Sequence, residues 1–182
     1  MSYTQKSIIV KGIVIIVIVL SSLLNGHLQM NRKVNQVEDI FMNGEDGSGL
    51  SIHYDLKKID DSMSYCISLA KANHQENNHY IKQVNDLHKN FSSLKTIKQY
   101  SQWYNDVQDH FPLAMGYLEG LSLSQEHRNM LSKYQATYKS ATHTIAYSPY
   151  NQYVRDYQEE TSGWFAEIIK KGTHVKEVDS FD

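Results

Sequence analysis

The chain has 182 residues, with 18 Lys and Arg against 20 Asp and Glu, giving a formal net charge of −2. It therefore lacks the basic surface that a general nucleic-acid binder needs, and no nucleic-acid partner is expected. One cysteine, Cys66, excludes an internal disulfide, and the length allows one domain with a core plus an anchor or a tail.

The most apolar segment of the chain covers residues 8–28. A helix of about 20 apolar residues crosses the hydrocarbon of a bilayer, and Lys11 is near enough to one end to reach the interface. A secretory signal peptide is the rival interpretation, but Leu24, Asn25 and Gly26 replace the small residues that a cleavage site needs. We therefore expect residues 1–28 to form an N-terminal tail and a transmembrane anchor, with membrane lipid as its first partner.

Basic residues do not decide the orientation of this anchor. Lys6 and Lys11 precede the apolar segment, and Arg32 and Lys33 follow it, so the positive-charge rule gives a tie. We favour a soluble part outside the membrane, and the side remains open. Met30, Val34, Val37 and Phe41 continue the helical spacing, which predicts one unbroken helix over about 7–43.

Helical periodicity continues beyond a glycine-rich break at 43–49. Apolar residues in steps of three and four predict a long helix over 56–94, weakened or bent by the polar stretch 73–78. Its seam should bury Met63, Cys66, Leu87 and Phe91, while Asp61, Lys71 and Lys82 face water.

Three further helical segments complete the expected fold. One covers 97–112 and ends at Pro112, before a corner or a short helix at 113–123. Ser124 should cap the next helix, which Pro149 ends or kinks, and a last amphipathic segment covers 150–163. The prediction is an all-α chain: an N-terminal transmembrane helix followed by an antiparallel up-and-down helical bundle over 29–163. Residues 164–182 should form a C-terminal tail, with a short helical stretch and a frayed acidic end.

Several segments have a familiar pattern: Tyr150-Asn151-Gln152-Tyr153-Val154-Arg155-Asp156-Tyr157, the preceding Ile145-Ala146, the ending at 176–181, and parts of 56–74 and 121–131. In these residues the chain resembles the LemA family of bacterial membrane-anchored helical proteins, as a divergent member. It departs from the family pattern in the glycine-rich insert, in Pro149, and in Ser64, where the family has a proline. The resemblance implies a single-pass protein of the bacterial cytoplasmic membrane, and it supplies no catalytic residues.

Candidate catalytic and metal-binding groups are scattered through the chain. His74 and His79 are five apart, roughly 140° around a helix, so they do not share a face. Neighbouring carboxylates such as Asp60 and Asp61 diverge on a helix and should be solvated. Cys66 lies on the apolar seam as a small core residue. We therefore expect no catalytic, cofactor-binding or metal site, and no enzymatic activity.

Tyrosines are the most distinctive residue type, with 13 in the chain. They suit a bundle core and its rim, and we expect Tyr134 and Tyr138 to be core. Tyrosine is also enriched at interfaces, so Tyr150, Tyr153 and Tyr157 form a candidate partner-binding face. The expected function is a non-enzymatic accessory or interaction protein of the cell envelope with an unidentified protein partner. An exported soluble binding protein with a cleaved N-terminal segment is the alternative.

Overall fold

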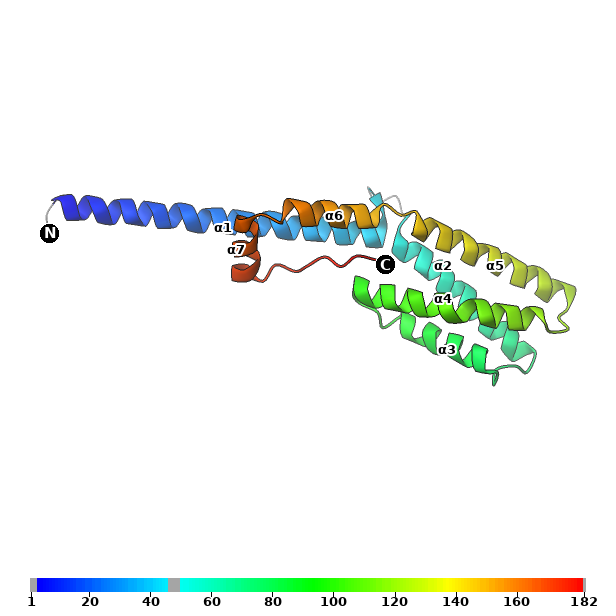
Figure 1. Cartoon of the computed structure of the whole chain (residues 1–182). Helices are drawn as coiled ribbons and strands as arrows, with labels where there is room; N and C mark the ends of the chain where they lie inside the picture. Colours follow the sequence, from blue (N-terminus) through cyan, green and yellow to red (C-terminus); the bar gives the residue numbers. More distant parts are fainter. Residues whose placement is uncertain (1–2, 46–49, 182) are drawn as a thin grey trace. The chain divides into compact units, whose positions relative to one another are not determined.

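The computed structural model describes residues 3–45 and 50–181. Within these ranges it has seven helices and no strand (Figure 1), which confirms the all-α prediction. The helices are α1 (Tyr3–Asn43), α2 (Ile52–Ala72), α3 (His79–Phe91), α4 (Ile97–Glu119), α5 (Gln125–Ala146), α6 (Tyr150–Glu160) and α7 (Trp164–Thr173).

The chain forms two compact units. The first consists of Met1–Val37 and Gln152–Val178, and the second consists of Glu38–Asn151 and Asp179–Asp182. This division differs from the predicted boundaries at 28/29 and 163/164. The reason is that α1 beyond Leu28 buries Met30 and Val34 in the first unit, to which α7 also belongs.

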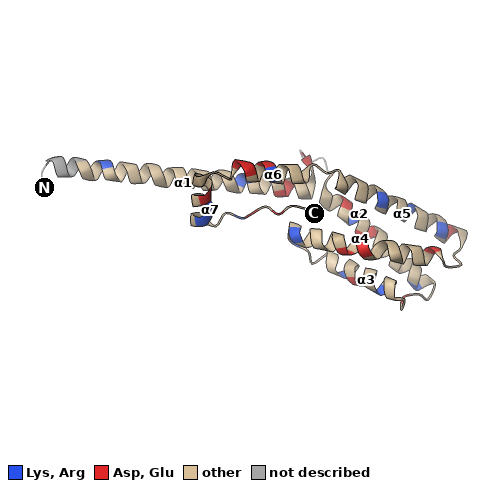
Figure 2. Ribbon diagram, in the orientation of Figure 1, with Lys and Arg blue, Asp and Glu red and all other residues tan. Residues whose placement is uncertain are grey.

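Helix α1 is unbroken from Tyr3 to Asn43, which confirms the predicted single helix. Apart from Lys11, its residues 8–28 carry no Lys, Arg, Asp or Glu (Figure 2). The helix ends at Asn43, and Gly44 follows with a φ of 81°, a conformation that suits glycine. The rest of the predicted glycine-rich break, residues 46–49, lies outside the described residues.

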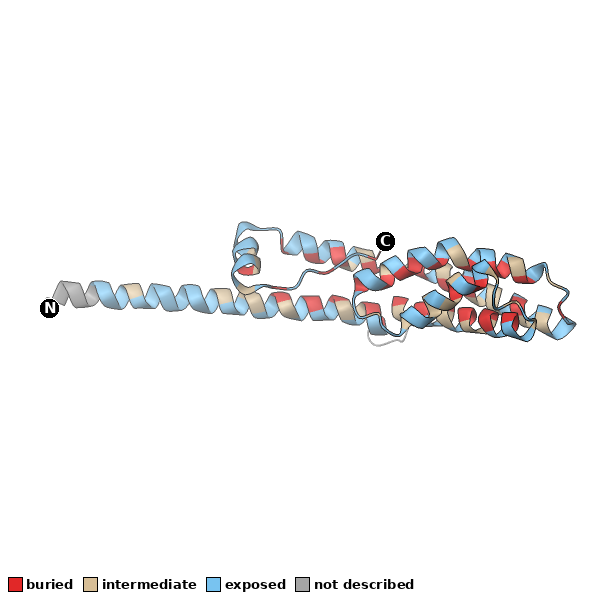
Figure 3. Ribbon diagram, turned by 90° about the horizontal axis from the view of Figure 1, so that it is seen from below, coloured by how far each residue is buried: buried red, intermediate tan, exposed pale blue. Residues whose placement is uncertain are grey.

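The second unit is built around α2, α3, α4 and α5, which run alternately up and down (Figure 1). Helix α2 packs on α3 and α5, and α3 packs on α4. The buried sides of these helices face one another (Figure 3), as the apolar spacing predicts. The fully enclosed side chains include Leu56, Ile59, Met63, Cys66, Ile81, Val84, Val107, Phe111 and Leu118.

The predicted long helix over 56–94 is wrong, because the chain turns back after Ala72. His74 adopts a left-handed conformation with a φ of 55°, and Asn78 starts α3 by accepting a hydrogen bond from the Tyr80 amide at 2.9 Å. Leu87 and Phe91 are consequently half-buried rather than enclosed. Met63 and Cys66 are buried, and Asp61, Lys71 and Lys82 are exposed, as predicted.

Helix α4 also differs from its prediction, since it continues through Pro112 to Glu119. Pro112 lies on the exposed side of the helix, where water can replace the hydrogen bond that proline cannot donate. The corner therefore begins at Gly120 and not at Leu113. Ser124 caps α5 as predicted, accepting a hydrogen bond from the His127 amide at 3.2 Å.

Pro149 separates α5 from α6, as expected, but the described part of the acidic end, up to Phe181, is not frayed. In the second unit the Tyr150 hydroxyl donates to the Asp179 carbonyl at 2.9 Å. The Asn151 side chain donates to the Phe181 carbonyl at 2.7 Å and accepts from the Phe181 amide at 2.8 Å. These three bonds hold the tail against the bundle and bury the Phe181 ring.

Candidate functional site

The N-terminal half of α1 is an apolar rod without a protein covering. Apart from the half-buried Leu23, the large apolar side chains of residues 8–28 keep between 45% and 66% of their surface exposed. Its apolar part has a mean hydropathy of 2.5. In the described part of the chain this is the one helix long and apolar enough to cross a membrane, a test that a signal sequence would also pass.

Further along, the same helix becomes one wall of the first unit. Helix α6 lies beside it (Figure 1), burying Val154 and Tyr157. Lys33 of α1 forms an ion pair with Glu160, the last residue of α6. Opposite charges and an apolar stripe on each helix thus fix α6 to the part of α1 that follows the apolar rod.

Helix α7 packs across α1 at Gly26 and His27. The end of the Ile169 side chain occupies the space that a Cβ atom at Gly26 would need, so any larger residue at Gly26 would force Ile169 to shift. Beside it, the His27 Nδ1 and Thr173 Oγ1 atoms are 2.8 Å apart, and Asn31 donates to His27 Nε2 at 2.9 Å. Thr173 in turn donates to the Ile169 carbonyl at 2.7 Å.

These bonds form one directional chain, from Asn31 through His27 and Thr173 to Ile169. With the Asn31 amide nitrogen as a donor to Nε2, the His27 tautomer that carries its proton on Nδ1 satisfies both contacts. Helix α7 is therefore held both by packing and by polar contacts that have a defined direction.

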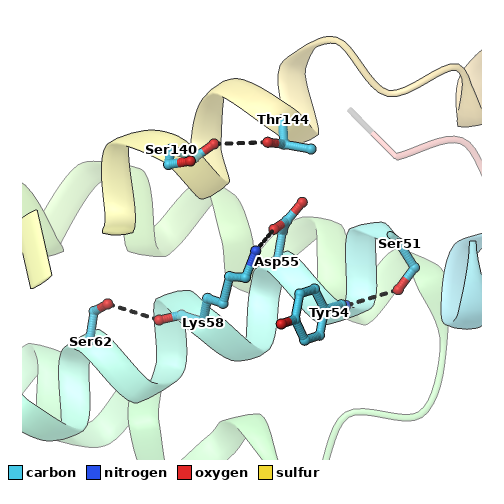
Figure 4. Close-up of polar contacts among 7 residues, drawn as sticks. All are labelled: Ser51, Tyr54, Asp55, Lys58, Ser62, Ser140 and Thr144. Carbon is cyan, nitrogen blue, oxygen red and sulfur yellow. Dashed lines mark hydrogen bonds and ion pairs between the residues drawn. The ribbon is translucent and has the colours of Figure 1, made fainter. Parts of the chain in front are cut away.

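An ion pair between a buried carboxylate and a partly exposed lysine lies on α2 in the second unit (Figure 4). Asp55 is 3% exposed and accepts a hydrogen bond from Lys58 Nζ at 2.9 Å. The same Nζ lies 4.3 Å from the centre of the Tyr54 ring. Since each partner is satisfied locally, this pair is a structural element of α2 and offers no free base or nucleophile.

A histidine–carboxylate pair joins α3 to α2. His88 Nδ1 lies 2.7 Å from Asp60 Oδ1, and burial raises the pKa of Asp60 although the contact with His88 opposes that shift. Asp60 was expected to be solvated, and its half-burial follows from the α2–α3 hairpin that closes over it. Among the described residues, no three His, Cys, Asp or Glu side chains gather as metal ligands.

Cys66 is fully buried, and burial raises the pKa of its thiol to about 12. A thiol with such a pKa is not an activated nucleophile. This location agrees with the core position that its apolar spacing predicts.

The two predicted core tyrosines of α5 have different environments. Tyr138 is buried with its ring edge-on to Phe111, at 5.1 Å between centroids, which confirms the prediction. Tyr134 is half-buried and stacks on Tyr65 of α2 at 4.3 Å, at the edge of an open hollow of about 430 Å³. The prediction of a core position is wrong for Tyr134: it shares a helix face with the buried Leu131 and Tyr138, but its ring lies at the rim of the hollow.

The predicted partner-binding face of Tyr150, Tyr153 and Tyr157 requires correction. Tyr150 is 1% exposed and Tyr157 is 5% exposed, whereas Tyr153 is half-buried. Tyr150 is enclosed by the Phe41 ring, at 5.4 Å, and by the C-terminal tail. Only Tyr153 of this trio keeps an accessible ring. The Tyr65–Tyr134 stack was missed because Tyr65 lies off the apolar seam of α2.

Together these features define an all-α protein with one candidate membrane-spanning helix near its N-terminus. Comparisons with protein-family models, with curated proteins and with solved structures give no match for this chain.

Proposed function

We propose that this chain is a single-pass, non-enzymatic interaction protein of the bacterial cytoplasmic membrane and a divergent relative of the LemA family. The observation that carries the proposal is the uncovered apolar part of α1. Soluble proteins rarely expose an apolar patch of more than a few hundred Å², and a rod of this length exceeds that in water. In a bilayer the same apolar surface is covered by lipid acyl chains.

The bundle is the part that would meet an unidentified protein partner. One candidate surface is the open hollow beside the stacked rings of Tyr65 and Tyr134, which Lys58 and Asp61 also line. Tyrosine is enriched among the central contacts of protein interfaces, and charged residues are more typical of their rims. We favour a bundle outside the membrane, and crosslinking in native membranes followed by mass spectrometry identifies the partner and its side.

An alkaline carbonate wash of membranes tests the attachment itself. We expect the intact chain to stay in the pellet, because α1 is held by lipid and not by a protein contact. A variant with Ile16→Lys and Val19→Lys should move to the supernatant, since each central lysine costs about 3 kcal/mol of insertion free energy. Met42→Lys, on the same helix but outside the apolar part, is the matched control and should stay.

The alternative, an exported soluble binding protein, predicts a different result from the same preparation. The chain would then appear in the supernatant, and its mass would be lower by that of the cleaved N-terminal segment. Recovery of such a shortened chain would refute membrane attachment.

A further inference from the structure

Helix α7 crosses α1 at the end of the apolar rod. Gly26 lies 18 residues beyond Ile8, or about 27 Å along a helix axis, close to the roughly 30 Å thickness of the hydrocarbon. The contacts of Ile169 with Gly26 and of Thr173 with His27 therefore fix α7 at the level where the rod would leave the hydrocarbon.

Both views of the first unit draw α7 running across α1 and not along it (Figures 1 and 3). A helix that runs across a spanning helix lies along the plane of the membrane. At this level, the plane is the boundary between acyl chains and lipid headgroups.

The two sides of α7 that flank its contact with α1 differ in chemistry. Lys170 lines a hollow with Tyr157 and Gln158 of α6, so the side of α7 that carries Lys170 faces α6. Helix α6 lies beyond Gly26, on the side away from the apolar rod, as the pair of Lys33 with Glu160 requires.

The opposite flank faces back toward the apolar rod. Around a helix, Ile168 lies roughly 160° and Trp164 roughly 120° from Lys170. Trp164 is 77% exposed and Ile168 is 48% exposed. The apolar flank of α7 thus faces the side on which the bilayer would lie, and the Lys170 flank faces the side of the water.

We infer that α7 is an interfacial helix that inserts Trp164 and Ile168 into the headgroup–acyl boundary of a lipid bilayer, beside the point where α1 emerges. This inference rests on the membrane attachment proposed above and adds a second lipid contact to it. Tryptophan is the side chain most typical of this boundary. Lys171 is exposed at the edge of the flank, from which its long side chain can reach lipid phosphates.

Tryptophan fluorescence of the full chain in lipid vesicles tests this placement. The chain has two tryptophans, and Trp103 is buried in the bundle of the second unit at 3% exposure. Phosphatidylcholine brominated near the carbonyl end of its acyl chains quenches tryptophan at the boundary. We expect it to remove up to roughly half of the wild-type emission, because one of two tryptophans would lie at the interface.

Trp164→Phe is the matched variant, because an exposed ring is replaced by a smaller one and the core is unchanged. It should lose nearly all of the quenching, and lipid brominated near the methyl end should quench the wild type less. Flotation of the same vesicles after a carbonate wash reports membrane attachment separately.

Each other outcome overturns the inference in a recognisable way. Equal quenching of wild type and Trp164→Phe, with both chains floating, would show that α7 is not in lipid although α1 is. A blue-shifted Trp164 emission without bromine quenching would place α7 against a protein, either a partner or a second copy. If neither chain floats, the membrane attachment itself is refuted and this inference with it.

Discussion

Phe41 offers the sharpest test of the packing in the second unit. Its ring is fully buried, and the Tyr100, Tyr150 and Phe181 rings lie 5.7, 5.4 and 5.5 Å from it between centroids. Phe41→Ala removes all three contacts and leaves a cavity, which typically costs about 3–5 kcal/mol. Against a total stability of about 5–15 kcal/mol for a native domain, this loss is roughly a fifth or more.

Urea unfolding of the full chain in detergent micelles measures this loss. In a Trp164→Phe background the emission comes from Trp103 alone and so reports the second unit. Phe41→Leu, which keeps much of the volume, should cost less than about 1.5 kcal/mol. Met42→Ala, at a residue 40% exposed, should change stability by less than about 0.5 kcal/mol. A loss below about 1 kcal/mol for Phe41→Ala would refute the three-ring environment, since buried aromatics cost more than that.

Three further predictions concern the tail, the thiol and alkaline stability. Asn151→Ala removes both hydrogen bonds to Phe181, at a cost of about 1 kcal/mol each. Hydrogen exchange of the Phe181 amide should therefore accelerate. Unchanged exchange would contradict the attachment of the tail to the bundle. Cys66 should not react with a thiol reagent at neutral pH until urea unfolds the protein, because the thiol is buried and its pKa is about 12; rapid native labelling would place α2 in another register. Burial raises the pKa of Tyr138 to about 12, so its stabilising contribution is complete below its ordinary pKa of 10.0 and is lost as the pH rises toward 12. Tyr138→Phe should flatten the fall of the urea midpoint over that range, and an equally steep fall would contradict the buried phenol.

Apolar spacing located the helices but not the place where one turns back. Ala70 and Ile81 are separated by 11 residues, about three helical turns, so the buried stripe of α3 continues the phase of α2 as though the helix were unbroken. The turn is indicated only by its polarity and by Asn78 as a cap. At Pro112 the error was the reverse, since a helix end was predicted where α4 continues. An exposed proline costs a helix one hydrogen bond and need not end it.

Burial of individual tyrosines depended on neighbours that the spacing does not reveal. Tyr150 and Tyr134 both lie on tyrosine pairs of helical period, yet the first is enclosed by Phe41 and the tail, and the second opens onto a hollow. The burial of the C-terminal tail could not be predicted for the same reason. Val175, Val178 and Phe181 follow a spacing of three in a polar segment, and only tertiary partners decide that they are buried.

The first unit is assembled from two segments that are synthesised far apart in time. Val37 and Gln152 are separated by 115 positions, which a ribosome adds at roughly 5–20 residues per second, so on the order of ten seconds pass between them. During that interval α2 to α5 are complete, whereas Met30 and Val34 of α1 still lack the helices that bury them. The first unit can therefore close only after α2 to α5 have been made, and a chain interrupted before α6 would carry these four helices together with an uncovered apolar stripe on α1.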